Sequence, residues 1–406
     1  MSDDARGNEV LMHQARAVRN RRGRGRWRLP GLRAPATGFV LSLLVLLSPD
    51  LTLAPLNAGE PHRAGPVPID LIDIRATGRG VRHIETAPSP VPTPAAQAVA
   101  PDARYQAALD AARTAGGAHG IAFAAVRDGR VVWSGSAGRN RDGTTPLRPD
   151  DALVIGSVTK TFVAAAILQL VDEGRIGLDD KLAMHLPAMA AMAPDVTLRQ
   201  LLNHTSGLAD VFNDTTRRGL EEHPEVAWTA AQVLESIHAP WYKPGDGWAY
   251  ANTNYFLLGL VIEQLSGASL SDELSRRFIR PLALDDTRVL TGDDDGPLAP
   301  AWATIFWASG AMSASASDLA HWGDALFGEQ LLRPGTRAAM IKVNDHDYGL
   351  GAQRIELPGA VGYGHTGLLS TYTTLLVYLP ESNVTLSLLV NRSHVDLGGM
   401  LTAKPG

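Results

Sequence analysis

A serine and a lysine three residues apart, Ser157 and Lys160, have the side chains and the spacing for nucleophilic catalysis. The segment 162–171 that follows is apolar except for one glutamine, and a helix without a polar face is buried. Residues three apart share a helix face, so the hydroxyl and the amine are expected to be neighbours. The positive end of the helix dipole disfavours a charged Lys160, which would activate the serine. The same pattern also arises by chance, as an N-cap serine with a surface lysine.

Two further groups of residues suit the same chemistry. Tyr250 and Asn252 follow a Lys-Pro-Gly turn and precede a predicted helix over 254–266. A phenol beside the serine–lysine pair can carry the proton from Ser157 to a leaving group, and the Asn252 amide can hold a carbonyl on the acyl side. The run 364–368, Gly-His-Thr-Gly-Leu, is predicted to open a strand whose edge donates N–H groups to a substrate backbone.

Composition and charge exclude several other classes of protein. The chain has 406 residues, 45% of them hydrophobic and 19% charged, and a net charge of −5, which suits a globular body with a full core. The mild acidity argues against a nucleic-acid partner. The absence of cysteine excludes disulfides, thiolate nucleophiles and cysteine-ligated metals. The histidines show no metal-binding spacing, so neither a metal nor a cofactor is expected.

The N-terminal part of the chain is interpreted as a targeting segment, residues 1–58. Nine arginines lie between Arg6 and Arg33, and the apolar run 38–47 follows them. A run of this length suits a secretory signal, because a membrane span needs about 20 residues. An uncleaved anchor is the alternative, and it would tether the protein to the membrane. In both cases the arginines stay on the cytoplasmic side, and the body is expected to be periplasmic or otherwise extracytoplasmic.

The remainder is predicted to be a spacer followed by a folded domain. Residues 59–101 are rich in proline and alanine and form the spacer. The domain, 102–406, is predicted to be α/β of the α+β kind, an antiparallel sheet flanked by helices and interrupted by an all-helical insert at about 179–300. The predicted elements are a helix over 105–114, a hairpin of 121–126 and 131–134, capped helix starts near 197 and before 318, and strands over 348–355, 372–378 and 384–390.

With these motifs in order over about 105–391, the chain resembles the penicillin-recognising serine hydrolases. This superfamily includes class C β-lactamases, serine D-Ala-D-Ala carboxypeptidases and related esterases. The resemblance implies a β-lactamase/transpeptidase-like fold. It also implies that Ser157 forms an acyl-enzyme, that Lys160 and Tyr250 share the general acid–base work, and that Asn252 orients the substrate. Which of Lys160 and Tyr250 is the base stays open.

The remaining candidates lie on the substrate side of the site. The resemblance implies that His365 and Thr366 border the substrate's carboxylate or leaving group, next to Gly367. It also implies an oxyanion hole formed by the N–H groups of Ser157 and Leu368. Arg354, on a predicted neighbouring strand, is a candidate to grip a substrate carboxylate, with a solvated strand residue as the alternative.

These features predict an exported serine hydrolase that acts on D-alanyl peptides, esters or amides, on a small-molecule or peptidoglycan-derived substrate. The alternatives are a class C-type β-lactamase and a penicillin-binding sensor that is acylated without turnover. Relatives often have lysine where this chain has His365, which is mostly neutral at pH 7 and holds a carboxylate less firmly. We therefore expect ester or D-alanyl hydrolysis to be faster than β-lactam hydrolysis.

Overall fold

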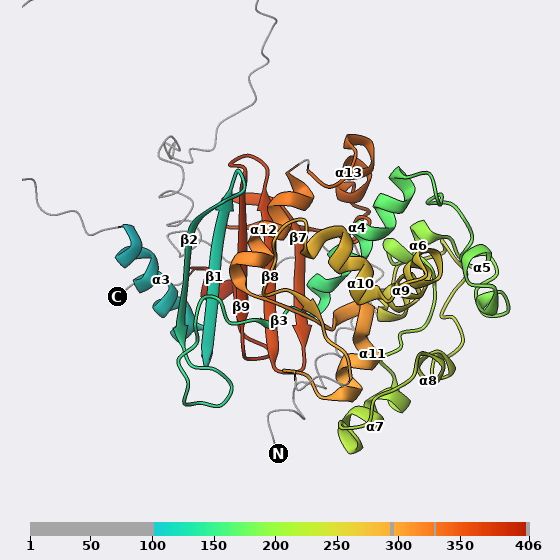
Figure 1. Cartoon of the computed structure of the whole chain (residues 1–406), viewed down its shortest axis with the longest axis horizontal. Coiled ribbons are helices and arrows are strands. Elements are labelled where there is room, and N and C mark those ends of the chain that lie inside the picture. Colours follow the sequence, from blue (N-terminus) through green and yellow to red (C-terminus); the bar gives the residue numbers. More distant parts are fainter. Residues whose placement is uncertain (1–100, 293–295, 329, 403–406) are drawn as a thin grey trace, which may run out of the picture.

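The fold is built around a six-stranded antiparallel sheet with the strand order β2-β1-β9-β8-β7-β6 (Figure 1). The structure is a computed structural model, and it describes residues 101–292, 296–328 and 330–402. The predicted targeting segment 1–58 and all but the last residue of the predicted spacer 59–101 lie outside these residues. Within the described ranges, none of the helices combines the length and the apolar character needed to cross a membrane.

The strands form this sheet and a smaller one of order β3-β5-β4. Their bounds are β1 (Gly120–Arg127), β2 (Arg130–Gly138), β3 (Leu153–Val154), β4 (Arg288–Val289), β5 (Met312–Ala314), β6 (Gln353–Leu357), β7 (Ala360–Leu369), β8 (Tyr372–Leu379) and β9 (Val384–Val390). The predicted α+β class is confirmed, since strands from both ends of the described chain meet in one sheet where β1 pairs with β9.

The helices follow in chain order. They are α3 (Pro101–Ala115), η1 (Gly156–Val158), α4 (Thr159–Asp172), α5 (Leu182–His185), η2 (Pro187–Met189), α6 (Leu198–Leu202), α7 (Asp214–Glu222), α8 (Ala230–Glu235), α9 (Asn252–Ser266), α10 (Leu270–Leu274), η3 (Ser275–Ile279), α11 (Pro300–Gly310), α12 (Ala316–Phe327), α13 (Pro334–Ile341) and α14 (Leu397–Thr402). Here η1 and η2 are 3-10 turns, and η3 is a π-helical turn.

The two faces of the sheet are covered by different helices. Alternate residues of β1 point to opposite faces: Ile121 and Phe123 pack in a cluster with α3 and α14, whereas Ala122 and Ala124 belong to the main core with α12. The helices from α4 to α11 gather beside the β7 end of the sheet, at the right in Figure 1. Helices α5 to α10 fall inside the predicted insert.

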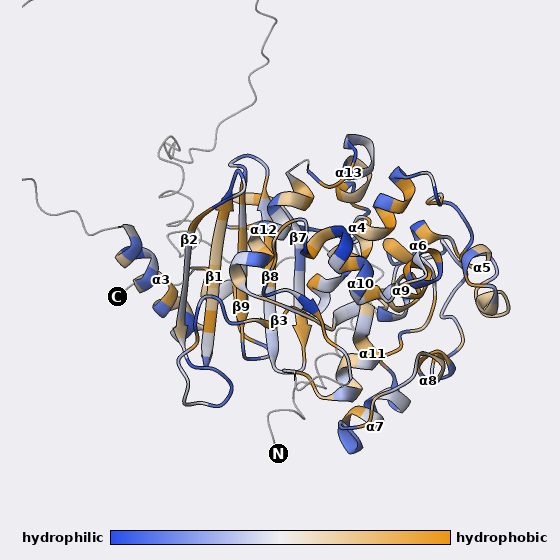
Figure 2. Ribbon diagram, viewed as in Figure 1, coloured by the Kyte–Doolittle hydropathy of each residue, from blue (hydrophilic) through white to orange (hydrophobic). Residues whose placement is uncertain are grey.

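Helix α4 is the buried centre of the helical part. It packs against α9 and α11, and its residues from Thr159 to Leu168 are all buried. Figure 2 shows hydrophobic ribbon along parts of this helix and along β1 of the sheet. The helix ends at Asp172, just before Gly174, whose φ of +71° favours glycine. The predicted buried helix is confirmed.

Most of the predicted local elements are confirmed, and two are wrong. The hairpin turns at Asp128 and Gly129, and capping side chains start α6 and α12. The strand predicted over 348–355 begins only at Gln353, because the chain makes a tight turn with Gly351 at a φ of +84°. The run 364–368 does not open a strand but lies in the second half of β7.

Candidate active site

Ser157 lies in the η1 turn, between β3 and α4, where it is half-buried. Two glycines let this turn approach β7 closely. A Cβ added to Gly156, whose φ is +53°, would lie 2.8 Å from the Leu368 backbone nitrogen. A Cβ added to Gly367 would lie 2.0 Å from the Ile155 carbonyl oxygen. Side chains at either position would push the turn and the strand apart, so the glycines hold Ser157 beside the N–H of Leu368.

Lys160 is fully buried, and its amine contacts three oxygen atoms. The nitrogen Nζ lies 2.8 Å from Asn252 Oδ1, 2.7 Å from the Ser309 carbonyl oxygen and 3.2 Å from Ser157 Oγ. The Asn252 and Ser309 oxygens are acceptors only, whereas a hydroxyl both donates and accepts. A neutral amine therefore donates its two hydrogens to Asn252 and Ser309 and directs its lone pair at the Ser157 hydroxyl.

The surroundings of Lys160 favour this neutral form. Burial lowers the pKa of the Lys160 amine to about 7, and the negative charge of Asp210 opposes that shift. Burial, rather than the helix start invoked from the sequence, is the main physical cause, because an ammonium loses its hydration in the interior. A substantial fraction of the molecules thus holds an unprotonated amine near neutral pH.

Tyr250 lies against the same amine. The Lys160 nitrogen is 4.9 Å from the centre of the Tyr250 ring, and the His204 ring lies tilted by 30° against the Tyr250 ring, with 4.3 Å between the ring centres. Burial raises the pKa of the Tyr250 phenol well above its ordinary value, although a hydrogen bond with Ser157 works in the opposite direction. The phenol therefore stays protonated, and it can donate a proton where Lys160 can accept one.

Asn252, the first residue of α9, is held by Asp210, which lies in the buried loop between α6 and α7. One carboxylate oxygen of Asp210 accepts the Asn252 N–H at 3.0 Å and the Phe212 N–H at 3.2 Å. The other accepts the Asn252 side-chain NH₂ at 3.3 Å. Burial raises the pKa of Asp210 to about 6, against these hydrogen bonds and the charge of Lys160.

His365 is buried, and both of its ring nitrogens have partners inside the protein. Nε2 lies 2.9 Å from the Tyr348 hydroxyl, and Nδ1 lies 2.6 Å from the Thr366 carbonyl oxygen. Because a carbonyl only accepts, Nδ1 carries the hydrogen and Nε2 accepts from Tyr348. Burial, followed by the charge of Lys160, lowers the pKa of His365 to about 3. The resemblance implied that His365 borders the substrate's carboxylate or leaving group, and in the structure both of its ring nitrogens already have partners within the protein.

Thr366 is contacted by Gln353 rather than by Arg354. The Gln353 side-chain oxygen accepts from the Thr366 N–H at 2.9 Å and from its hydroxyl at 3.1 Å. Arg354, the next residue of β6, binds Glu356 at 2.8 Å and lies 3.6 Å from Asp347. Side chains alternate along a strand, so a shift of one residue changes the face. The structure does not bring Arg354 to the Ser157 cluster, and the predicted grip on a carboxylate has no support from its contacts.

The sequence did not reveal Asp210, Ser309, Tyr348 or Gln353 as members of the site. Asp210 had a signal, since it is the one acid in the apolar run 208–212, where a buried charge needs a reason. Ser309 contributes its backbone carbonyl, which any residue has. His204 is fully buried and accepts the Ala251 N–H at 3.2 Å.

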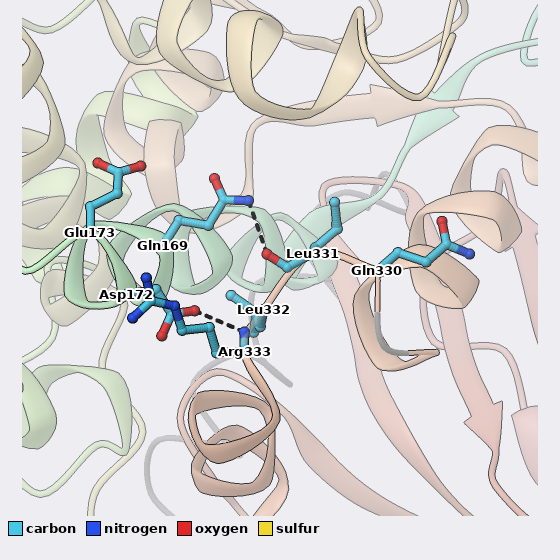
Figure 3. Close-up of a pocket in the computed structure, with 7 residues that line it drawn as sticks. All are labelled: Gln169, Asp172, Glu173, Gln330, Leu331, Leu332 and Arg333. Atoms are coloured by element: carbon cyan, nitrogen blue, oxygen red, sulfur yellow. Dashed lines mark hydrogen bonds between the residues drawn. The ribbon is translucent and has the colours of Figure 1, made fainter.

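An open pocket of about 380 Å³ lies at the opposite end of α4 (Figure 3). Asp172 lies twelve positions after Lys160 in the helix, which corresponds to about 18 Å along its axis. In this pocket Asp172 accepts the Arg333 N–H, and Gln169 donates to the Leu331 carbonyl. These polar groups form hydrogen bonds with one another, and the pocket is not part of the Ser157 site. Its lining residues are Gln169, Asp172, Glu173, Gln330, Leu331, Leu332 and Arg333.

Comparisons with known proteins agree with this geometry. The family model described as Beta-lactamase matches residues 105–403. Penicillin-binding protein 4 of Amycolatopsis lactamdurans is 28% identical over 341 residues, which cover 74% of this chain and 86% of that protein. The D-aminopeptidase of Brucella anthropi is 31% identical over 282 residues, which cover 62% of this chain and about half, 52%, of that protein.

Solved structures show the same fold. A D-stereospecific amidohydrolase from Streptomyces sp. is similar with a TM-score of 0.64 and 31% identity, over 74% of this chain and 97% of that chain. A penicillin binding protein from Bacillus halodurans, 24% identical, has a TM-score of 0.63 over 72% of this chain and 98% of that chain. The predicted β-lactamase/transpeptidase-like fold is thus confirmed. Since the family model matches well over half of its length, the chain belongs to the Beta-lactamase family and is a serine hydrolase.

Proposed function

We propose that this serine hydrolase cleaves amide or ester bonds on the carbonyl side of a D-amino acid residue, through an acyl-enzyme on Ser157. The observation that carries the proposal is the Lys160 amine. Its pKa is about 7, and its two shortest contacts are to acceptor oxygens, so the free lone pair faces the Ser157 hydroxyl. This arrangement activates a serine without a histidine.

The proposed reaction has two halves. Lys160 takes the proton of the Ser157 hydroxyl as its oxygen attacks the substrate carbonyl carbon, and the resulting oxyanion is held by the N–H groups of Ser157 and Leu368. The carbon–nitrogen or carbon–oxygen bond then breaks, and the leaving group receives a proton from Tyr250, which recovers one from Lys160. In the second half, water attacks the carbonyl carbon of the Ser157 ester and gives a proton to the same pair. The bond to Ser157 Oγ then breaks, the pair returns the proton to that oxygen, and the acid is released.

The assignment of Lys160 as the base follows from the two pKa shifts. Burial places the Lys160 pKa near 7 and the Tyr250 pKa well above 10. A general base works best with a pKa near the working pH, and a phenol that stays protonated serves as the acid. Lys160 is therefore the acceptor in the first half, and Tyr250 is the donor to the leaving group.

The preference for a D-residue is supported by similarity. A D-aminopeptidase and a D-stereospecific amidohydrolase are each 31% identical to this chain. A small amino acid or peptide derivative is accordingly the proposed substrate, and a peptidoglycan-derived peptide is one member of this class.

The contacts of His365 and Arg354 count against a dedicated β-lactamase. His365 is held neutral with both nitrogens bonded, and Arg354 is ion-paired with Glu356. Neither offers a free positive charge to the carboxylate of a β-lactam, so the alternative of a class C-type β-lactamase is less favoured.

A panel of substrates in one buffer tests the proposal. We expect kcat/KM for D-alanine p-nitroanilide to exceed that for the L-isomer, and p-nitrophenyl butyrate or diacetyl-Lys-D-Ala-D-Ala to be hydrolysed faster than nitrocefin. Nitrocefin as the best substrate would favour the β-lactamase alternative. Acylation by penicillin without turnover of any substrate would favour the sensor.

Ser157→Ala is the matched control for the panel. A fluorophosphonate probe should label the wild-type protein and leave this variant unlabelled, with the same circular dichroism spectrum. Ser206, a buried serine bonded to Asn254 at 2.7 Å, provides a second comparison, and Ser206→Ala should still be labelled. Labelling that persists in Ser157→Ala would reject the acyl-enzyme.

We also propose that the hydrolase domain acts outside the cytoplasm. The support is the sequence alone: the arginines before residue 34 and the apolar run 38–47. An alkaline phosphatase fused after residue 101 should be active in a bacterial host, and a reporter that folds only in the cytoplasm should be silent. The reverse pattern would place the domain inside the cell.

A further inference from the structure

We propose that Asp210 is a positioning residue of this active site, which fixes the Asn252 amide with its oxygen toward Lys160 and sets the charge beside the amine. The inference rests on the proposed function, because it concerns Lys160 as the base for Ser157. Asp210 belongs to none of the three motifs that identified the site, and it lies in the loop between α6 and α7.

The first step is the double attachment of Asn252. The Asp210 carboxylate accepts both the backbone N–H of Asn252, at 3.0 Å, and its side-chain NH₂, at 3.3 Å. Both residues are buried. An asparagine that is held at its backbone and at its amide by one carboxylate has no freedom to rotate the amide independently.

The second step is the direction of the amide. A carboxylate only accepts hydrogen bonds, so the NH₂ group of Asn252 has to face Asp210. The amide oxygen therefore faces Lys160, whose nitrogen lies 2.8 Å away. A flipped amide would set a donor against the amine and the amide oxygen against the carboxylate. The lone pair of Lys160 would then lose its direction toward Ser157.

The third step is the charge. Asp210 raises the pKa of Lys160, against the larger effect of burial. The other titratable groups around the amine are His204, His365, Tyr250 and Tyr255, and burial keeps all of them in the neutral form. Tyr348, which binds His365, is also neutral. Among the described residues, Asp210 is the carboxylate whose charge acts on Lys160, so its removal should make the amine less basic.

A purely structural role for Asp210 predicts something different. The same loop is also fastened to α9 by the Thr253 hydroxyl, which donates to the Ala209 carbonyl oxygen at 2.6 Å. This bond does not involve the Asp210 carboxylate, so the loop keeps an anchor when Asp210 is changed to asparagine. A structural role would alter the stability of the protein without moving the pH dependence of catalysis.

The test compares pH profiles of kcat/KM for wild type and Asp210→Asn. The acidic limb should move to lower pH by about one unit, because a nearby opposite charge shifts a pKa by about 1–3. The plateau should fall about tenfold or more, because the Asn252 amide is no longer oriented. Asp324→Asn is the matched control, since Asp324 is a buried carboxylate in α12 that accepts the Gly129 N–H at 2.8 Å. Its limb should coincide with that of wild type.

Failure of this proposal and failure of the proposed function give different results. If Lys160→Arg and Ser157→Ala are inactive but the Asp210→Asn limb does not move, or moves to higher pH, Asp210 has no positioning role and the function stands. If Ser157→Ala remains active, the function itself fails. Asp210→Ser, which retains an acceptor hydroxyl, replaces Asp210→Asn if circular dichroism shows that the asparagine variant is unfolded, and its limb must also move to lower pH.

Discussion

The proposed mechanism depends on one buried amine, that of Lys160. With its pKa lowered to about 7, the amine changes from the charged to the neutral form as the pH rises through neutrality. Only the neutral form accepts the Ser157 proton, so kcat/KM should rise through about pH 7 and then stay level. The Tyr250 phenol, with its pKa raised well above 10, should not limit the rate before strongly basic pH.

The pH profile of kcat/KM with a p-nitroanilide substrate measures this directly, because it reports groups of the free enzyme. Lys160→Arg should be at least about 100-fold slower at every pH, since a guanidinium does not lose its proton. Lys181→Arg is the control, because Lys181 is exposed and pairs with Asp195 at 2.8 Å. An acidic limb that stays near pH 7 in an active Lys160→Arg enzyme would contradict the assignment of the base.

At the level of residues, the sequence predicted the reacting groups better than the groups around them. Ser157, Lys160 and Asn252 meet as expected, because a helical turn and a helix start have fixed geometry. His365 and Arg354 have partners that the sequence did not indicate, since His365 Nε2 contacts the Tyr348 hydroxyl and Arg354 pairs with Glu356, two residues along the same strand. The Tyr348 hydroxyl, which contacts His365 Nε2, lies 17 residues earlier in the chain. A turn and a strand separate the two residues, and no local sequence pattern indicates their contact.

At the level of elements, the contact between η1 and β7 determines the position of the proposed oxyanion hole. A Cβ on Gly367 would come within 2.0 Å of the Ile155 carbonyl oxygen, which belongs to the backbone and cannot turn aside. Gly367→Ala should therefore separate Leu368 from Ser157. Loss of one oxyanion donor typically slows acyl transfer by about 100- to 1000-fold, and we expect a fall in kcat of this size.

Gly335→Ala is the matched control for Gly367→Ala. A Cβ at Gly335, in the first turn of α13, would meet no atom within 4 Å, so activity should be unchanged. Fluorophosphonate labelling of Ser157 separates an active-site effect from unfolding, since a folded Gly367→Ala protein should label slowly but completely. Wild-type kcat in Gly367→Ala would show that the close approach is not needed for catalysis.

Elements with strong local signals were predictable from the sequence, and the irregular ones were not. The apolar run of α4 and the capping residues of α6 and α12 each determine a helix locally. The Ser309 carbonyl depends instead on a kink in α11 at Trp307, where the backbone leaves the helical conformation. Nothing in the side chains of 300–310 signals that kink, so the third partner of Lys160 required the structure.

At the level of the whole molecule, the ionisation of Lys160 also contributes to the free energy of unfolding. The amine has a pKa of about 7 in the folded protein and of 10.5 when exposed. Between these values the unfolded chain holds a proton that the folded chain lacks. Stability is higher at higher pH wherever the unfolded state binds more protons, so this group alone makes the free energy of unfolding increase from about pH 7 to 10.

The slope for one proton is at most about 1.4 kcal/mol per pH unit. The pKa values of the histidines His204, His346 and His365 are lowered from 6.5, so the extra protons that they bind in the unfolded chain are lost mostly below pH 7 and contribute little to the change above it. The buried tyrosines, whose pKa values are raised above 10, act only at the upper end, where ionisation of the unfolded chain reduces stability. Between pH 7 and 9.5 the change in the free energy of unfolding therefore comes mainly from Lys160.

We expect urea unfolding of the folded domain to show a greater free energy of unfolding at pH 9 than at pH 7, and Lys160→Met to lose most of this difference. The comparison uses the change with pH and not the absolute stability, because methionine also leaves the Asn252 and Ser309 oxygens without their donor. Lys181→Met, at an exposed ion pair, should keep the wild-type difference. An equal slope in Lys160→Met would mean that Lys160 does not lose its proton on folding, and the neutral amine that activates Ser157 would lose its thermodynamic basis.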